Sequence, residues 1–372
     1  MTSTAEQVPA ELNQHGPNGS SSPGGSTGPS GVSDHSTDRN GPRLRSLTDV
    51  IVETDAKMRL GLSAGARVWP TGFLALDQAL SGGFRSGELV LLGGPQGLGK
   101  TAMALQMLRN TVAANRSAVF FSYEHDAHSI LERLIAIEAA VVAGTDAATL
   151  SKIRQGFEAR HSVAHSMGER FAGLRGGAEA LQALEGYGDR LHVHTSSGIH
   201  TTLEDIRAAV AEVTDSDGRP PMVLVDYLQK VPVTGSSGSE DERVAIVVER
   251  LKDMALELGV PIIAVVAAEK DSLVGGRRMR VNDLRGSSAL AYEPDIVLIL
   301  NEKYDIVAKH HLVYHLGNAE RFRHWVVMSI EKNRNGADHL ELEFQKRFEQ
   351  GRFEPEGRVV EEQLIESRVF RE

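Results

Sequence analysis

The chain has 372 residues, of which 41% are hydrophobic, and this is enough for one large domain or two small ones. Its formal net charge is −10, so nucleic acid could be held only by a local basic patch and not by the overall charge. The sequence contains no cysteine, which excludes disulfides, thiolate metal sites and cysteine nucleophiles.

The first residues lack the basic segment and apolar run of a secretory signal, and no stretch approaches the ~18 apolar residues of a membrane span. We therefore expect a cytoplasmic protein with no membrane contact. Residues 1–42 are rich in Gly, Ser, Pro and other small polar residues, so they are predicted to be a disordered tail. A partner-binding tail is the alternative.

A helical pattern over residues 43–69 places Leu47, Val50, Ile51 and Met58 near one face. This predicts a short linker helix that docks either on its own domain or on a neighbouring subunit. The main domain is expected to span residues 70–355, and residues 356–372 are expected to form a C-terminal tail.

Short apolar runs alternate with helical patterns in the main domain. The runs cover residues 88–94, 117–123, 222–228, 261–267 and 294–300, and the clearest helix ends at Gly259. Apolar strands separated by helices predict an α/β fold with a mostly parallel sheet flanked by helices. After Trp325, alternating residues on both sides of an Asn-Gly turn predict a final β-hairpin.

A complete Walker A motif lies between the first of these runs and a helical pattern. Its residues are Gly94, Pro95, Gln96, Gly97, Leu98, Gly99, Lys100 and Thr101. The glycines let backbone N–H groups surround phosphates, and the helix N-terminus adds its positive end. Lys100 is expected to reach the β- and γ-phosphates of ATP, and Thr101 to ligate Mg²⁺.

Two carboxylates follow apolar runs of the same sheet. Asp226 is placed where a Walker B aspartate holds the magnesium, although an ordinary strand-end aspartate is the alternative. Glu124 follows the strand after the P-loop helix and can polarise the attacking water; helix capping or solvent exposure would explain it equally well. His192 and His194 alternate on a predicted strand, and His310, His311 and His315 cluster later, without metal-ligand spacing.

Together these residues resemble the RecA-like C-terminal motor domain of DnaB-type hexameric helicases. The similarity runs from Thr71 to about Phe353, through TGFLALDQALSGGFRSGELVLL, GPQGLGKT, FFSYE, VDYLQ, NDLRGSSALAYEPDIVLIL and EKNRNG. The resemblance implies a ring, usually a hexamer, with ATP between subunits and Glu124 as the catalytic base. Lys332 and Arg334 match the positions of a lysine and an arginine finger. Taken without the resemblance, they would be solvated turn residues.

A basic, glycine-containing stretch is the candidate for binding single-stranded DNA. It includes Arg277, Arg278, Arg280, Arg285, Gly286 and Ser288. Arg285 matches a DNA-contacting arginine of the family, with Gly286 and Ser288 at neighbouring loop positions. A solvated basic loop is the alternative.

The sequence departs from the family pattern at three points. Ala267 stands where the family has a glutamine that senses the γ-phosphate, with Glu269 and Lys270 as candidate replacements. The stretch RGSS lacks an acidic residue after Arg285. The short tail replaces the family's N-terminal domain. We therefore expect an accessory, plasmid-type or specialised relative.

The resulting hypothesis is a Mg²⁺- and ATP-dependent DNA helicase that hydrolyses ATP between the subunits of a homo-oligomeric ring and translocates on single-stranded DNA. The alternative is a RecA-, RadA- or KaiC-like ATPase that binds DNA or protein without unwinding. A non-enzymatic nucleotide-binding scaffold is a third class, and intact Lys100, Thr101, Glu124 and Asp226 argue against it.

Overall fold

The computed structural model describes residues 44–61, 65–159, 165–235, 238–268, 277–313 and 318–367. The tail of residues 1–42 lies outside this part, as do Glu269, Lys270 and His315. Contacts divide the chain into residues 1–43 and residues 44–372, and everything described belongs to the second unit.

The first described element is the amphipathic helix α1 (Leu47–Arg59). Its N-terminus is closed by a capping box, in which Ser46 and Asp49 each accept a hydrogen bond from the other's backbone N–H. No residue of α1 is buried, and the side chains of Leu47 and Met58 are 74% and 65% exposed. The helix therefore presents its apolar face openly.

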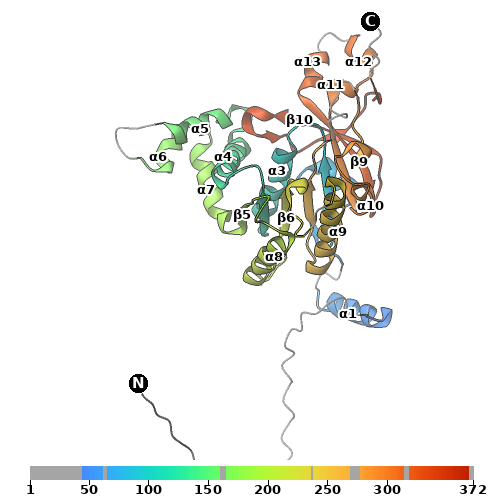
Figure 1. The fold of residues 1–372 in the computed structure, drawn as a ribbon. Helices are drawn as coiled ribbons and strands as arrows, with labels where there is room; N and C mark the ends of the chain where they lie inside the picture. Colours follow the sequence, from blue (N-terminus) through green and yellow to red (C-terminus); the bar gives the residue numbers. More distant parts are fainter. Residues whose placement is uncertain are drawn as a thin grey trace, which may run out of the picture. The chain divides into compact units, whose positions relative to one another are not determined.

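A large mixed sheet forms the centre of the domain (Figure 1). Six neighbouring strands are parallel, and the strands after them are antiparallel. In spatial order the strands are β5 (Leu191–Thr195), β4 (Ala118–Ser122), β6 (Met222–Asp226), β7 (Ile262–Val265), β3 (Leu89–Gly93), β8 (Ile296–Glu302), β9 (Trp325–Asn333), β10 (Leu340–Arg347) and β11 (Arg352–Phe353), with β12 (Arg358–Val359) also paired to β10. The predicted mostly parallel sheet and final hairpin are confirmed.

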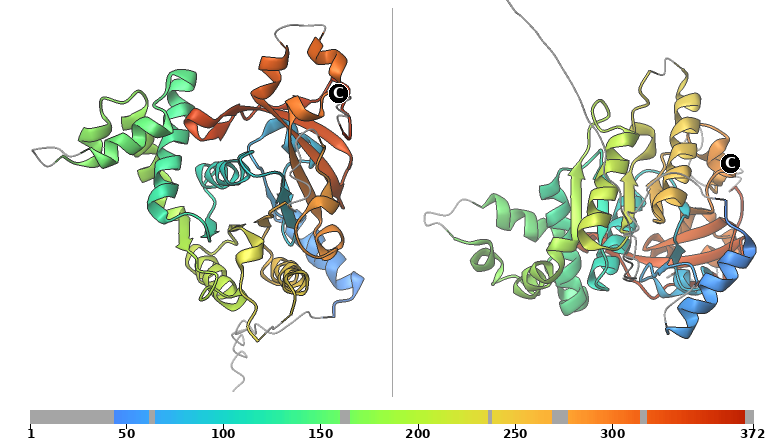
Figure 2. Two further views of the ribbon diagram at one scale, coloured as in Figure 1. Left: turned by 45° about the horizontal axis from the view of Figure 1, so that its top comes forward. Right: turned by 90° about the horizontal axis from the view of Figure 1, so that it is seen from below.

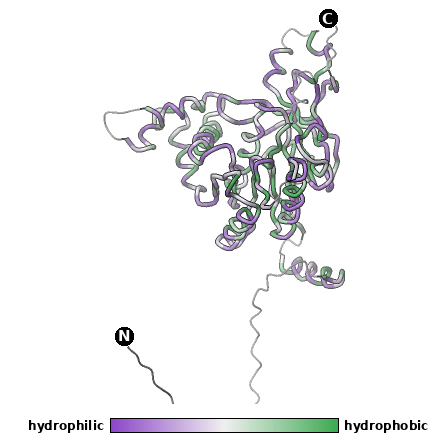
Figure 3. The backbone as a smooth tube through the Cα atoms, viewed as in Figure 1, coloured by the Kyte–Doolittle hydropathy of each residue, from purple (hydrophilic) through white to green (hydrophobic). Residues whose placement is uncertain are grey.

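Helices cover both faces of this sheet, as the two views of Figure 2 show. One face packs against α2 (Leu74–Ala79), α3 (Lys100–Ala113) and α4 (Ala127–Ala143), and the other against α8 (Leu203–Asp217) and α9 (Glu240–Leu258). Central strands such as β3 are buried at every position, which explains their uninterrupted apolar sequences. Hydrophobic residues accordingly run along these strands in Figure 3.

A third hydrophobic cluster joins α4 to a helical group on the side away from the sheet (Figure 1). This group comprises α5 (Leu150–Glu158), α6 (Met167–Phe171) and α7 (Gly177–Tyr187). The buried side chain of Gln350 donates to the backbone oxygens of Gly144 and Thr145, 2.8 and 3.2 Å away, before α5 begins. The helical group is thus tied to the C-terminal part of the sheet.

The remaining elements are short. They are the hairpin of β1 (Val68–Trp69) and β2 (Phe84–Arg85), helices α10 (Ala289–Tyr292), α11 (Lys303–Ile306), α12 (Lys309–Val313) and α13 (Asn318–Arg323), and the 3₁₀ turns Gly144–Asp146, Gly188–Arg190, Leu228–Lys230, Val281–Asp283 and Phe348–Gln350. Among the described residues, no helix has both the length and the apolar character that crossing a membrane requires.

Candidate functional site

The Walker A residues form the turn between β3 and α3. Gly99 is the N-cap of α3 with φ +83°, a left-handed conformation that glycine adopts without steric cost. A Cβ at Gly99 would also lie 2.8 Å from the ring of Phe348. Lys100 donates from Nζ to the backbone oxygens of Gly94 and Pro95, at 2.7 and 2.9 Å. The lysine ammonium is therefore held inside the curve of the loop.

The rest of the motif divides between the cleft and the core. Gln96 and Gly97 are exposed and line the cleft, while Leu98 is buried in the hydrophobic core. Burial lowers the pKa of Lys100, and the nearby carboxylates of Asp226 and Glu124 partly offset this effect. The loop thus lines the cleft with Gln96, Gly97, Gly99 and the lysine that phosphate binding requires.

Thr101 and Asp226 meet at the base of the loop. The hydroxyl of Thr101 donates to the Asp226 carboxylate at 2.7 Å, and Asp226 is only 1% exposed at the end of β6. Burial raises the pKa of Asp226 to about 6, against the opposing effects of the Thr101 hydrogen bond and Lys100. A hydroxyl and a carboxylate are hard oxygen ligands, so the pair fits Mg²⁺, which takes few protein ligands and completes its shell with phosphate and water.

Glu124 follows β4 and projects into the same cleft as an exposed carboxylate. Arg133 of α4 also lines the cleft, although no motif in the sequence marks it. Its Nε is buried without a hydrogen-bond partner among the described residues, and burial lowers the pKa of its guanidinium. A half-buried cation with an unpaired N–H on the wall of an anion site is a candidate ligand for a terminal phosphate.

The cleft has a volume of about 610 Å³ and receives residues from distant parts of the chain. Besides the Walker A residues and Glu124, its walls include Leu150, Ala267, Arg285, Phe348 and Gly351. Phe348 stands on the turn between β10 and β11, with its side chain 39% exposed. An aromatic ring at the edge of a phosphate site can stack on a base. No spacing in the sequence marks Phe348 or Leu150 for this place.

Lys332 and Arg334 lie away from this cleft, at the end of β9. Lys332 donates to the backbone oxygens of Ala291 and Tyr292 at 2.9 and 2.7 Å, and Arg334 donates to that of Tyr292 at 2.6 Å. The backbone N–H of Arg334 donates to Asp295, whose carboxylate accepts from Leu89 at the start of β3. The P-loop begins at the other end of β3, about 13 Å along the strand at ~3.3 Å per residue.

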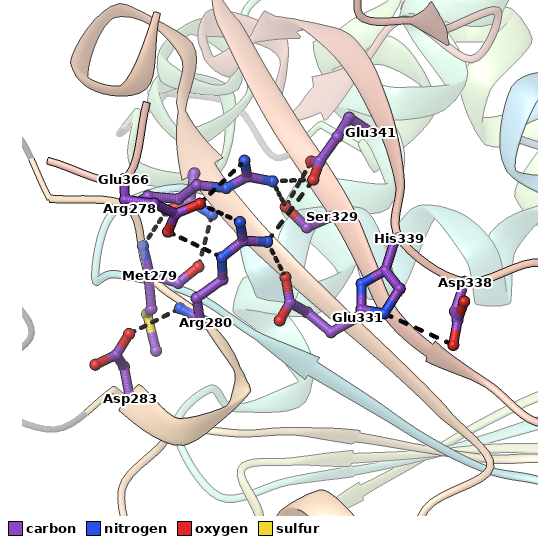
Figure 4. A network of polar contacts seen from close by, with 11 residues as sticks. Arg278, Met279, Arg280, Asp283, Ser329, Glu331, Asp338, His339, Glu341 and Glu366 are labelled. Carbon is purple, nitrogen blue, oxygen red and sulfur yellow. Dashed lines mark hydrogen bonds and ion pairs between the residues drawn. The ribbon is translucent and has the colours of Figure 1, made fainter. Parts of the chain in front are cut away.

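The arginines expected to bind DNA are all engaged with carboxylates. Arg278 is 6% exposed and pairs with Glu341, while Arg280 pairs with Glu331 at 2.7 Å (Figure 4). Arg277 lies 2.7 Å from Asp283.

The other residues expected to bind DNA are Arg285, Gly286 and Ser288. Arg285 lies 2.6 Å from Glu240 at the rim of the nucleotide cleft. Gly286 has φ +122° and faces Val244, and Ser288 is exposed at the N-cap of α10. The structure therefore leaves Arg285 and Ser288 more accessible than Arg278.

One side chain connects the nucleotide cleft to this loop. Gln229, just after β6, donates to the backbone oxygen of Arg285 at 2.8 Å and accepts from the backbone N–H of Ala267 at 3.2 Å. Ala267 accepts in turn from the backbone N–H of Arg285 at 2.9 Å. Movement at the end of β6 is thereby linked to the loop carrying Arg285.

Comparison with known proteins gives a consistent result. The model of the DnaB-like helicase C terminal domain matches residues 69–354. The replicative DNA helicase DnaB of Treponema pallidum (strain Nichols) is 27% identical over 280 residues, covering 75% of this chain and 54% of that protein. The replicative DNA helicase DnaB of Rickettsia bellii (strain RML369-C) is 30% identical over 270 residues, covering 68% and 49%. The chain spans about half the length of the curated relatives it matches.

Solved structures agree on the fold. One solved ATPase domain superimposes with a TM-score of 0.65 at 19% identity, covering 84% of this chain and 99% of that one. A DnaB-like replicative helicase, described with its interactions with primase, gives 0.64 at 20% identity and covers 83% and 68%. The helices and strands around the P-loop thus follow a RecA-like arrangement.

Proposed function

The chain belongs to the family of DnaB-like helicase C-terminal domains, and from this we propose that it is an ATP-driven DNA helicase motor. It would work as a cytoplasmic homo-oligomeric ring, a hexamer as in the resemblance, that translocates on single-stranded DNA. The observation that carries the proposal is the separation of two half-sites on one subunit, with the P-loop at one end of β3 and Lys332 and Arg334 beyond the other.

The nucleotide half-site has the groups that ATP hydrolysis needs. Lys100 and the loop N–H groups would bind the phosphates, and Thr101 with Asp226 would hold Mg²⁺, which neutralises phosphate charge when bound. Glu124 would orient and deprotonate the attacking water from its exposed position on the cleft wall. Arg133 would add positive charge from the wall of the cleft.

The second half-site requires a neighbour. Lys332 and Arg334 cannot reach their own P-loop without crossing the length of β3, so they would serve the ATP of the adjacent subunit. The side chain of Arg334 is 48% exposed; its guanidinium donates to the backbone oxygen of Tyr292 and lies 3.7 Å from the carboxylate of Asp295. A change of rotamer would break both contacts and release the guanidinium toward a facing subunit, and Asp295 would keep its ion pair with Lys252 at 2.7 Å.

Family membership also supports the helicase over the alternative of a RecA-, RadA- or KaiC-like ATPase without unwinding. The Gln229 link supports coupling in this chain, because it joins the end of β6 to the loop of Arg285. Arg285, Gly286 and Ser288 would contact DNA phosphates directly. Arg277, Arg278 and Arg280 would contribute where their carboxylate partners allow it.

The test measures ATP hydrolysis with and without single-stranded DNA for the parent protein, Lys100→Ala and Arg334→Ala. We expect DNA to stimulate the parent and each variant to lose at least ~10³-fold in turnover. Mixing the two variants should restore activity, because Lys100→Ala subunits supply intact fingers to the intact P-loops of Arg334→Ala subunits. Undiminished hydrolysis by Arg334→Ala would refute action in trans, and hydrolysis indifferent to DNA would favour the non-unwinding ATPase.

A further inference from the structure

The C-terminal residues 362–367, called the strap here, run as an extended segment across the base of the candidate DNA-binding stretch. Backbone N–H groups of Ala308 and Arg278 donate to the strap oxygens of Gln363 and Glu366, at 2.9 and 2.8 Å. The strap N–H of Ile365 donates to Ile306 at 2.8 Å. The strap therefore joins α11 to the residues that lead into the stretch.

The carboxylate of Glu366 contacts the guanidinium groups of two arginines (Figure 4). Its carboxylate accepts from Nε of Arg280 at 3.2 Å and also from a terminal nitrogen of the same guanidinium, so the pair is bidentate. Arg278 approaches the same carboxylate at 3.8 Å. Two guanidinium groups thus converge on one anionic group, which is the arrangement that recognises a phosphate.

The two arginines have other carboxylate partners that lie deeper in the fold. Glu331 of β9 has a side chain 9% exposed and Glu341 of β10 one 22% exposed, whereas that of Glu366 is 65% exposed. Without Glu366, two guanidinium groups would face two carboxylates and the cluster would be neutral. An external anion of single charge can therefore replace the exposed Glu366 carboxylate. Glu331 and Glu341 would keep their pairing with the two arginines.

Exchange at this position is balanced in charge, because a phosphodiester carries one negative charge, as Glu366 does. The strap can also leave without disturbing the sheet, since it belongs to no strand and is joined to the fold by the isolated bridges of Leu364 with Val307 and of Ser367 with Arg277. The Arg280 contacts lower the pKa of Glu366, so the carboxylate is charged at neutral pH.

We propose that Arg278 and Arg280 form a phosphate-binding position that the chain's own Glu366 occupies, and that the backbone of single-stranded nucleic acid displaces the strap from it. The inference rests on the proposed DNA-binding function and adds its regulation: the strap is an internal competitor that weakens binding until nucleic acid replaces Glu366. The same exchange frees residues 363–365 from α11 and α12.

The first experiment follows the strap itself. The chain has no cysteine, so Ser367→Cys gives a single attachment point for a fluorophore whose anisotropy reports strap mobility. Glu366→Gln should lower the anisotropy in the absence of DNA. Glu361→Gln is the matched control, because it removes the same charge from an exposed residue five positions earlier. Adding (dT)₂₀ should lower the anisotropy of the parent and leave that of Glu366→Gln unchanged.

The second experiment measures binding of labelled (dT)₂₀ by full-length protein over a range of salt concentrations. Glu366→Gln should bind roughly threefold to tenfold more tightly than the parent, and Glu361→Gln should not. The slope of log K against log salt should be steeper for Glu366→Gln than for the parent, by about 0.7 for each additional phosphate that the variant neutralises.

The outcomes distinguish the displacement of the strap from the proposed helicase function. DNA-stimulated hydrolysis with equal DNA affinity for Glu366→Gln and Glu361→Gln overturns the strap and leaves the helicase proposal standing. Equal anisotropy of the strap in Glu366→Gln and in the parent also overturns the strap proposal alone. Absence of DNA binding by every variant overturns both.

Discussion

Replacing Asp226 by asparagine should stabilise the nucleotide-free protein near neutral pH while abolishing its Mg²⁺-dependent ATPase activity. Asp226 is 1% exposed, and burial raises its pKa from 3.8 to about 6. The folded state therefore binds the proton more tightly than the unfolded chain does. For this group, stability is greatest below pH ~4 and falls as the pH rises toward 6.

The size of the effect follows from the difference in pKa. Roughly two pKa units at about 1.4 kcal/mol each mean that the charged carboxylate costs about 3 kcal/mol of folding free energy above pH 6. Asparagine carries no charge and keeps a polar contact with the Thr101 hydroxyl. The variant should be about 3 kcal/mol more stable than the parent at pH 7.5 and only about 0.5 kcal/mol more stable at pH 4.

Thermal unfolding without nucleotide, followed by circular dichroism between pH 4 and pH 8, measures this difference. The melting temperature of Asp226→Asn should exceed that of the parent by about 6 °C at pH 7.5, at roughly 2 °C per kcal/mol. Asp253→Asn, which changes an exposed aspartate on α9, should show no such gain. A gain that does not vary with pH, or a loss of stability at pH 7.5, would contradict the argument.

Three further changes have defined outcomes. Phe348→Ala should raise the KM for ATP about threefold to tenfold, and Phe348→Tyr should leave it near the parent value, because an aromatic ring at this edge of the cleft can stack on the base. Lys303→Met should destabilise the protein by about 3 kcal/mol in urea unfolding, since the buried Glu343 and the neighbouring Glu362 both lose their ammonium partner while Arg358 still pairs with Glu343; an unchanged free energy of unfolding would contradict this. Gly286→Ala should weaken DNA binding and lower the melting temperature, because a Cβ there would lie 2.7 Å from the side chain of Val244 and the backbone has a φ of +122°. Unchanged DNA affinity and melting temperature would mean that the loop relaxes to accept the methyl group.

Much of the nucleotide site could be predicted from the sequence because its signals are local. The Walker A spacing needs only a strand, a glycine turn and a helix in succession, and these lie within residues 88–113. Asp226 and Glu124 each follow an apolar run, and parallel strands end at one edge of a sheet. That rule is enough to place both carboxylates near the P-loop from their positions along the chain.

The other walls of the cleft depend on tertiary contacts. Arg133, Leu150 and Phe348 come from two helices and the C-terminal turn, and their spacing from the P-loop follows no motif. Phe348 reaches Gly99 only because β10 and β11 lie at the far edge of the sheet and turn back over α3. The sequence predicts a nucleotide site, and the fold places the ring of Phe348 at the edge of it.

The basic stretch is the clearest example of a feature that neighbouring residues in the sequence do not predict. From the sequence, Arg277, Arg278 and Arg280 form a positive cluster available to DNA. The fold pairs Arg277 with the nearby Asp283, and it pairs Arg278 and Arg280 with Glu331, Glu341 and Glu366, which are distant in sequence. By itself the sequence predicted the P-loop, the positions of Thr101 and Asp226 beside it and the α/β layering, because each follows from neighbouring residues. Only the tertiary structure decided which cations remain open to a ligand, because a charge is neutralised by whatever the folded chain places within a few ångströms.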